Sequence, residues 1–108
     1  MSIGFDELYE KAKPVLNPRR LSGSADAGVG AAILSESGAI YTGVRIDTGG
    51  SMGFCAEHAA AAAMITAGES RVLRMVAVGW DGRIVPSCGR CREFISQLHP
   101  TTARQRCW

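Results

Sequence analysis

The sequence predicts an α/β fold in which helices pack against one mixed β-sheet. Three observations lead to this prediction. Two short apolar segments flank a turn-forming stretch, an alanine-rich helical segment follows them, and a third apolar strand segment precedes a second helical segment. Strands followed by helices in this order are typical of an α/β sandwich. With 108 residues the chain is long enough for one domain and too short for two, so we expect one domain over residues 1–108.

The first predicted element is an amphipathic helix near the amino end. Its apolar residues have the i, i+3, i+4, i+7 spacing of one helix face: Phe5, Leu8, Tyr9 and Ala12. The helix has to end near Lys13, because a proline disfavours helical geometry in the residue before it. Residues 14–26 hold two prolines, an arginine pair and a Ser-Gly-Ser stretch, and we expect a loop there with no helix or strand of its own.

Strands are predicted at residues 29–34 and 39–44, and a hairpin turn between them at residues 35–38. A glycine-rich loop then leads into a helix from Cys55 to about Ala67, which ends at Gly68. This helix is apolar nearly all round, so we expect it to be buried.

A third strand is predicted at residues 72–79, and a turn follows at residues 80–83. The second helix is predicted to begin at Cys88 or Cys91 and to stop before Pro100, which cannot continue it. Its core face is expected to carry Phe94, Ile95 and Leu98.

Composition and charge narrow the class of protein. Apolar residues make up 46% and charged residues 20% of the chain, as in ordinary globular proteins. The net charge of +2 is too small to predict a nucleic-acid or membrane surface, and no apolar run is long enough to span a bilayer. The amino end has neither the basic start nor the apolar core of a signal sequence. We therefore expect a cytoplasmic protein with reduced cysteines.

The most informative pattern consists of Cys55, Glu57, Cys88 and Cys91. Cys88 and Cys91 are three residues apart at the start of a predicted helix, so their thiols share one face, while Cys55 starts the other helix. Three protein ligands leave one position of a tetrahedral zinc ion open for water, which is the arrangement of a catalytic zinc. Glu57 points in a different direction from Cys55, so it is free to move protons.

Other interpretations of the same residues remain open. Cys88 and Cys91 taken alone also suit a redox dithiol or half of a structural zinc site. His58 would close a structural site as a fourth ligand, because it lies three residues after Cys55, and Cys107 is a weaker candidate for that position. His58 equally suits a buried histidine or a partner of a metal thiolate. Neither structural site gives Glu57 a role.

The combined motifs resemble those of the zinc-dependent cytidine deaminases, in which a Cys or His, one residue and Glu are followed later by Pro-Cys-x-x-Cys. The matching stretches occur in the family order over nearly the whole chain: Val29-Gly30-Ala31-Ala32, Tyr41-Thr42-Gly43-Val44, Cys55-Ala56-Glu57 and Cys88-Gly89-Arg90-Cys91. The glycine pair before the first metal-bearing helix, the alanine run after it and the Leu-His-Pro at the end of the second helix are most similar to the blasticidin-S deaminase branch.

The resemblance implies a three-layer α/β/α fold, a zinc ion held by Cys55, Cys88 and Cys91, and hydrolytic deamination of a cytosine nucleoside. Water activated by zinc would attack C4 of the base, while Glu57 moves protons to ring N3 and to the departing amine, which leaves as ammonia. The expected substrate contacts are Arg45, Asp47 and Ala56. The partner implied is a small-molecule nucleoside, and the assembly a homotetramer or dimer.

Two pocket positions depart from the family pattern. Ala27 stands where the family usually has a phenylalanine beside the pyrimidine, and Arg45-Ile46-Asp47 replaces the Asn-x-Glu that binds the ribose hydroxyls. Asp47 can still accept from a hydroxyl, whereas Arg45 has donors only. We therefore expect plain cytidine to be a poor substrate. Residues 101–108 show no strand pattern, which predicts carboxyl-terminal strands that are shortened or missing.

Two further functions are compatible with these residues. The first is a blasticidin-S deaminase-type aminohydrolase, which would use the same zinc ligands and the same proton-transfer carboxylate on a larger cytosine-containing substrate. The second is a non-catalytic interaction domain stabilised by zinc, and it is favoured if the shortened carboxyl end removes the substrate pocket. Metal content and turnover, measured together, would separate the three functions.

Overall fold

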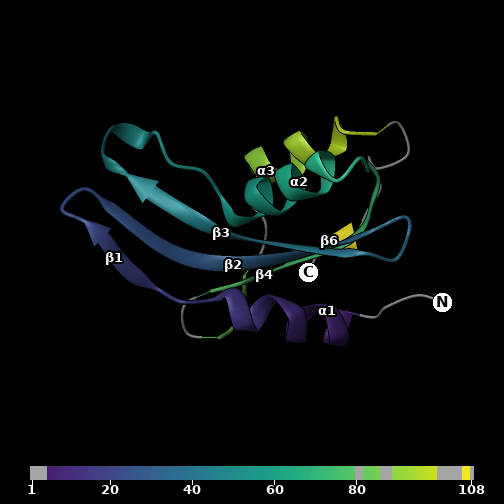
Figure 1. The fold of residues 1–108 in the computed structure, drawn as a ribbon, viewed down its shortest axis with the longest axis horizontal. Coiled ribbons are helices and arrows are strands. Elements are labelled where there is room, and N and C mark those ends of the chain that lie inside the picture. Colours follow the sequence, from purple (N-terminus) through teal and green to yellow (C-terminus); the bar gives the residue numbers. More distant parts are fainter. Residues whose placement is uncertain (1–4, 80–81, 86–88, 100–105, 108) are drawn as a thin grey trace.

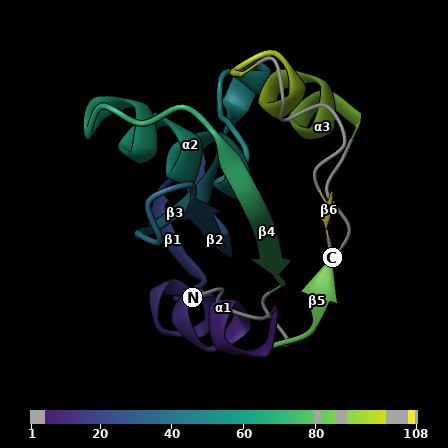
Figure 2. The ribbon, with the colours of Figure 1, turned by 90° about the vertical axis from the view of Figure 1, so that its right-hand side faces the viewer.

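The computed structural model describes residues 5–79, 82–85, 89–99 and 106–107. A β-sheet forms the middle layer, with α1 (Phe5–Ala12) on one face and α2 (Ala56–Thr66) and α3 (Gly89–Ser96) on the other (Figure 1). Turned by 90°, the molecule shows α1 below the strands and α2 and α3 side by side above them (Figure 2). This arrangement confirms the predicted α/β/α fold. None of the described helices is long and apolar enough to cross a membrane.

Strand β2 (Ala25–Ser35) lies at the centre of the sheet. It pairs antiparallel with β3 (Ile40–Thr48) along one edge, and with β1 (Arg19–Ser22) and β4 (Val72–Val78) along the other. Two short strands pair with the free edge of β4: β5 (Ile84–Val85) runs antiparallel to it and β6 (Arg106–Cys107) parallel. The parallel pair makes the sheet mixed, as predicted. Within the described residues, the carboxyl end contributes this one two-residue strand, at a place where no strand pattern was found.

The two faces of the sheet bury separate apolar clusters, because successive residues of a strand point to opposite faces. The cluster that α1 covers comprises Leu8, Ala12, Ala32, Leu34, Val76 and Val78. The cluster that α2 and α3 cover comprises Ile33, Ala60, Ala61, Met64, Val72, Met75 and Ile95. Thus α1 seals one face of the sheet, and the two helices predicted to carry the metal ligands seal the other.

Helix α2 begins directly after Cys55, which occupies the N-cap position. Gly68 follows the helix with a φ of +96°, a left-handed conformation that favours glycine, and its N–H donates to the carbonyl of Ile65. The predicted helix and its glycine stop are therefore confirmed. The expected burial on all sides is wrong, because one side of α2 faces the sheet and its outer side faces solvent. The exposed apolar residues on that outer side include Ala62, Ala63 and Ile65.

Helix α2 approaches β3 closely at Gly43. A Cβ atom at this position would lie 2.5 Å from the amide nitrogen of Ala60 and 2.6 Å from the Cβ of Ala59. Carbon atoms do not come this close to a backbone without displacing it, so the absence of a side chain at Gly43 allows α2 to lie deep on the sheet. The close approach sets the height of the helix start that carries Cys55 and Glu57.

The expectation of a loop without strands at residues 14–26 is wrong. A short 3₁₀ helix, Lys13–Val15, extends α1, and β1 forms a hairpin with the first residues of β2. All residues of β1 are exposed, so no apolar alternation marks this strand in the sequence. Backbone pairing forms it, together with an ion pair between Arg20 and Asp26 at 2.9 Å. Strand β5 was also not predicted, because two residues are too few to show a pattern.

Candidate active site

Two of the three predicted zinc ligands meet between α2 and α3. Cys55 caps the start of α2, and Cys91 lies in the first turn of α3. The ligand atoms of Cys55, Cys91 and His58 all lie within 4.8 Å of one another. The remaining predicted ligand, Cys88, lies outside the described residues.

One separation within this group matches that of two ligands of a zinc ion. Tetrahedral zinc with Zn–S of about 2.3 Å and Zn–N of about 2.05 Å places a sulfur and a nitrogen ligand about 3.6 Å apart. The Nδ1 atom of His58 lies 3.5 Å from the Sγ atom of Cys91. The geometry therefore accommodates His58 as a ligand, the interpretation that the sequence left open beside the three-cysteine site. The side chain of Cys107 is not among those described.

His58 is positioned by packing against α3. Its ring centroid lies 4.3 Å from that of Phe94, with 33° between the ring planes. Partial burial, and next the positive charge of Arg90, lower the pKa of His58 below its ordinary value of 6.5, while the negative charge of Glu57 opposes the shift. The shift favours the neutral imidazole, which is the state that binds metal ions.

Glu57 lies next to the thiols and is 4% exposed. It borders a cavity of about 270 Å³ whose other lining residues are Val29, Arg45, Cys55, Ala56, Val85 and Cys91. Among the described residues, the compact group of possible metal ligands holds two thiols and one imidazole and does not include this carboxyl group. Glu57 is therefore placed to exchange protons with a molecule in the cavity.

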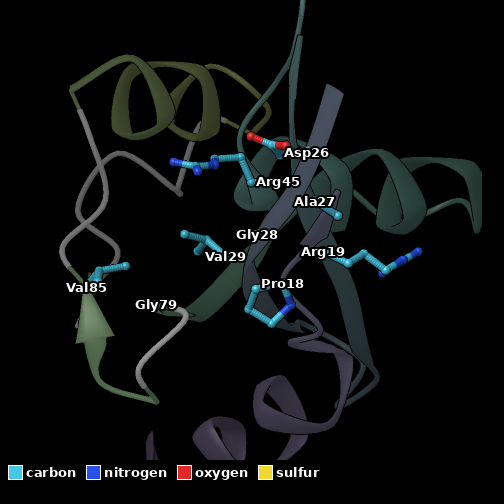
Figure 3. Close-up of a pocket in the computed structure, with 9 residues that line it drawn as sticks. All are labelled: Pro18, Arg19, Asp26, Ala27, Gly28, Val29, Arg45, Gly79 and Val85. Atoms are coloured by element: carbon cyan, nitrogen blue, oxygen red, sulfur yellow. The ribbon is translucent and has the colours of Figure 1, made fainter. Parts of the chain in front are cut away.

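Two more cavities adjoin the Glu57 cavity, one of larger volume and one of similar volume. The first has a volume of about 520 Å³ and shares Val29, Arg45 and Val85 with the Glu57 cavity (Figure 3). The second has a volume of about 260 Å³ and borders Cys55. Arg45 lines all three cavities, so it lies where they meet.

The predicted substrate contacts are distributed over these cavities. Arg45 and Ala56 line the Glu57 cavity, whereas Asp47 lines the 260 Å³ cavity and forms an ion pair with Arg45 at 3.0 Å. Ala27 lines the 520 Å³ cavity, whose volume a phenylalanine at this position would reduce. Val85 lines two of the cavities but could not be predicted, because its strand has only two residues and shows no pattern.

The fold is that of the cytidine deaminases. A solved structure of a mutant cytidine deaminase from Mycobacterium tuberculosis matches with a TM-score of 0.77 at 27% identity, over 96% of this chain and 89% of that chain. The cytidine deaminase from Mycobacterium leprae matches with a TM-score of 0.81 over 98% and 87% of the two chains. At 22% identity, this second likeness shows the fold alone.

Sequence comparison leads to the same family. The cytidine deaminase of Mycobacterium tuberculosis is 34% identical over 68 residues, which are 62% of this chain and 51% of the relative. That of Halalkalibacterium halodurans is 33% identical over 78 residues, 70% of this chain and 58% of the relative. The chain thus spans somewhat over half the length of the curated relatives that it matches. No family model matches the chain. The relatives and the solved structures together support the cytidine deaminase family.

Proposed function

We propose that this chain is a zinc-dependent aminohydrolase that deaminates a cytosine nucleoside and releases ammonia. The observation that carries the proposal is the nearly buried Glu57, which shares a cavity with Cys55 and Cys91. Hydrolytic deamination needs a proton-transfer group beside an activated water in a concave site, and these residues supply that combination. The matches to cytidine deaminases support the same class of reaction.

Each residue would have a distinct part in the reaction. Cys55 and Cys91, with Cys88, would hold the zinc ion. Zinc bound by three such ligands supplies a nucleophile at neutral pH, because it lowers the pKa of water in the open position. Glu57 would accept one proton from the attacking water and deliver it to ring N3, and would then pass the second to the amino group as the C4–N bond breaks. The products are the uracil nucleoside and ammonia.

The cavities offer room and apolar contact for such a substrate. Val29 and Val85 line both the Glu57 cavity and the 520 Å³ cavity, and their side chains point toward one another in Figure 3. A pyrimidine ring between them would exchange water for apolar contact. Pockets for small molecules have volumes of about 300–1,000 Å³, and the 520 Å³ cavity lies within this range.

A blasticidin-S-type aminohydrolase is the second candidate function. Ala27 leaves open part of the 520 Å³ cavity that a phenylalanine would fill, and this favours a cytosine-containing substrate bulkier than cytidine. The chemistry would be unchanged, because the base would still present C4 and its amino group to Glu57. The two enzymatic candidates therefore differ in the substrate and agree on the mechanism.

A closed structural zinc site is the alternative from a different class. The 3.5 Å separation between His58 and Cys91 is compatible with it, because His58 together with Cys55, Cys88 and Cys91 would fill all four positions of a tetrahedral zinc ion. No position would then be open for water, and Glu57 would have no reaction to serve.

The test measures zinc content and ammonia release on the same samples, with cytidine, deoxycytidine, cytosine and blasticidin S as substrates. We expect Glu57→Gln to keep its zinc and to lose about 100-fold to 10,000-fold in turnover, the usual contribution of general acid–base catalysis. Glu10→Gln, on the exposed side of α1, is the matched control and should behave as the wild type. Loss of zinc in the Glu57→Gln protein would instead make Glu57 a ligand. A zinc-loaded wild type that turns over none of the four compounds would favour the closed structural site.

We also propose that the chain acts in the cytoplasm as a homotetramer or dimer. Several large apolar side chains on the surface support self-association, notably Met52 at 80%, Leu21 at 45% and Phe54 at 42% exposure. Light scattering on the zinc-loaded protein at micromolar concentration should give the mass of an oligomer. A monomer mass under these conditions would contradict the assembly.

A further inference from the structure

The guanidinium group of Arg45 is only partly used by the protein. Its Nη2 atom pairs with Asp47 Oδ2 at 3.0 Å. Its Nε atom is buried and has no hydrogen-bond partner within the part of the chain that the structure describes. A guanidinium carries five N–H donors in a planar fork, and a buried donor without a partner costs free energy. Arg45 therefore retains donors that a ligand can satisfy.

A simple surface ion pair does not account for this arrangement. In such a pair both long side chains remain hydrated, and the net stabilisation is small. Here Gly28 lets the guanidinium lie against β2, since a Cβ at Gly28 would come within 3.2 Å of Nη2 and 3.6 Å of Nε. Arg19 and Arg45 both line the 520 Å³ cavity, and Figure 3 shows Arg45 reaching over it beside Val29 while the end of the Arg19 side chain extends to the opposite side. Of the two, Arg45 also lines the Glu57 cavity.

A second cation and a hydroxyl lie near Arg45. Arg90 of α3 lines the 260 Å³ cavity together with Arg45, and its charge acts on His58, which places it close to the metal-compatible group. Thr48 lines the same cavity, and its Oγ1 atom is also buried without a hydrogen-bond partner among the described residues. The described lining of this cavity thus brings two guanidinium groups together with one carboxylate, that of Asp47, which pairs with Arg45.

We propose that Arg45, with Arg90 and the Thr48 hydroxyl, binds an oxyanion on the sugar portion of the substrate. The preferred substrate is then a cytosine nucleoside that carries a carboxylate or a phosphate group, and neutral cytidine is a weaker ligand. Arginine binds either oxyanion through two parallel N–H···O bonds, and such charge-assisted bonds are stronger than those to a neutral hydroxyl. The subsite adjoins the Glu57 cavity because Arg45 lines both. The inference rests on the proposed deamination for the identity of the base.

Equilibrium binding tests the subsite without requiring turnover. Calorimetry on the zinc-loaded full chain would compare cytidine, cytidine 5′-monophosphate and cytidine 5′-carboxylic acid, and the last two separate a phosphate from a carboxylate source. We expect at least one anionic probe to bind about tenfold to a hundredfold more tightly than cytidine. The preference should weaken with added salt, because it depends on charge.

Substitutions assign the preference to Arg45. Arg45→Gln should abolish the preference for the anionic probe, and Arg45→Lys should retain only part of it, because lysine is a point charge without the planar fork. The matched control is Arg71→Gln. Arg71 has a similar side-chain exposure, 35% against 42% for Arg45, and a comparable ion pair with Glu36 at 2.8 Å, but lies outside the three cavities. This control should keep the preference.

The outcomes are distinguishable from those that test the deaminase proposal. Equal affinity of the wild type for neutral and anionic probes, or a preference that survives in the Arg45→Gln protein, overturns the subsite. Anionic preference without ammonia release from any probe keeps the subsite and refutes the deaminase. Deamination of cytidine without a preference for anionic probes supports the deaminase and refutes the subsite. The wild-type comparison and its salt dependence decide the matter even if the Arg45→Gln protein fails to fold.

Discussion

The Nδ1 atom of His58 lies 3.5 Å from the Sγ atom of Cys91. This distance suits two ligands of one metal ion and equally suits a hydrogen bond between an imidazole and a sulfur atom. As a ligand, His58 would complete the coordination of a zinc ion that already has three thiolates. As a hydrogen-bonding partner, it would orient Cys91 and leave one coordination position open for water. The two roles therefore predict different zinc contents for variants that lack His58.

We expect His58→Ala to retain about one zinc ion per chain, since three thiolates suffice for a site with an open position. Cys91→Ala should lose most of its zinc under the same conditions. Metal analysis after gel filtration measures both. An equal loss of zinc in the two variants would identify His58 as a ligand and favour the closed structural site.

Removal of zinc is expected to destabilise the fold. Cys55 caps α2 and Cys91 lies in α3, so a metal ion that binds both thiols connects the two helices. Because this site exists only in the folded chain, metal binding stabilises the folded state. With free zinc at about 100 times its dissociation constant, the melting temperature should exceed that of the chelated protein by roughly 10 °C or more. Cys55→Ser serves as the control and should respond little to chelation. An unchanged melting temperature of the wild type after chelation would contradict the prediction.

The stability of the hairpin between β2 and β3 should depend on pH through Glu69. Its carboxylate accepts hydrogen bonds from the hydroxyls of Tyr41 at 2.7 Å, Ser37 at 2.9 Å and Ser35 at 3.0 Å. The bond from Tyr41, and next that from Ser37, lower the pKa of Glu69 below its ordinary value of 4.5. A carboxylate with a lowered pKa in the folded state stabilises that state above the unfolded-state pKa, and the stabilisation is lost as the pH falls through the folded-state pKa.

We therefore expect Glu69→Gln to melt below the wild type at pH 7, and the difference to narrow as the pH falls below about 4.5. Thermal unfolding between pH 3 and pH 8 measures this, and Glu10→Gln controls for the loss of an ordinary exposed carboxylate. A difference that stays constant over this pH range would show that Glu69 contributes by packing alone.

A methyl group at Gly43 should disturb both stability and metal binding. Gly43→Ala would place a carbon atom 2.5 Å from the amide nitrogen of Ala60, and overpacking of this kind destabilises a fold by about 1–3 kcal/mol. Because α2 has to rise from the sheet, Cys55 moves relative to Cys91 and the affinity for zinc should fall. Gly23→Ala is the matched control, since nothing lies within 4 Å of a Cβ there. Equal urea midpoints and zinc affinities for the two variants would refute the prediction.

The longer elements of the fold were predictable from the sequence. The i, i+4 apolar spacing around Leu8 and the stop at Pro14 located α1, and the glycine after the alanine run located the end of α2. The cysteine spacing also led to the expectation that Cys55 and Cys91 meet, and the structure brings them together. Their role as zinc ligands, with Cys88, stays a prediction.

The rest could not be predicted, because it depends on contacts between distant segments. Strand β1 is exposed throughout and exists through its backbone pairing with β2, so no side-chain pattern reveals it. The alanine-rich composition of α2 predicted burial on all sides, but composition does not show which side a neighbouring layer covers. The Nε atom of Arg45, which has no hydrogen-bond partner among the residues that the structure describes, lies against Gly28, and only the folded chain makes this contact.

Because of the tight contact at Gly43, the shape of the cavities and the position of Cys55 depend on different residues, so the two can be changed independently. Residues at the cavity walls, such as Ala27, Val29 and Val85, can be varied to alter which molecules enter. Gly43 touches none of these cavities, yet it governs whether α2 can present Cys55 at the depth where Cys91 lies. A library that randomises the walls and preserves this glycine would vary the cavities while keeping Cys55, His58 and Cys91 together.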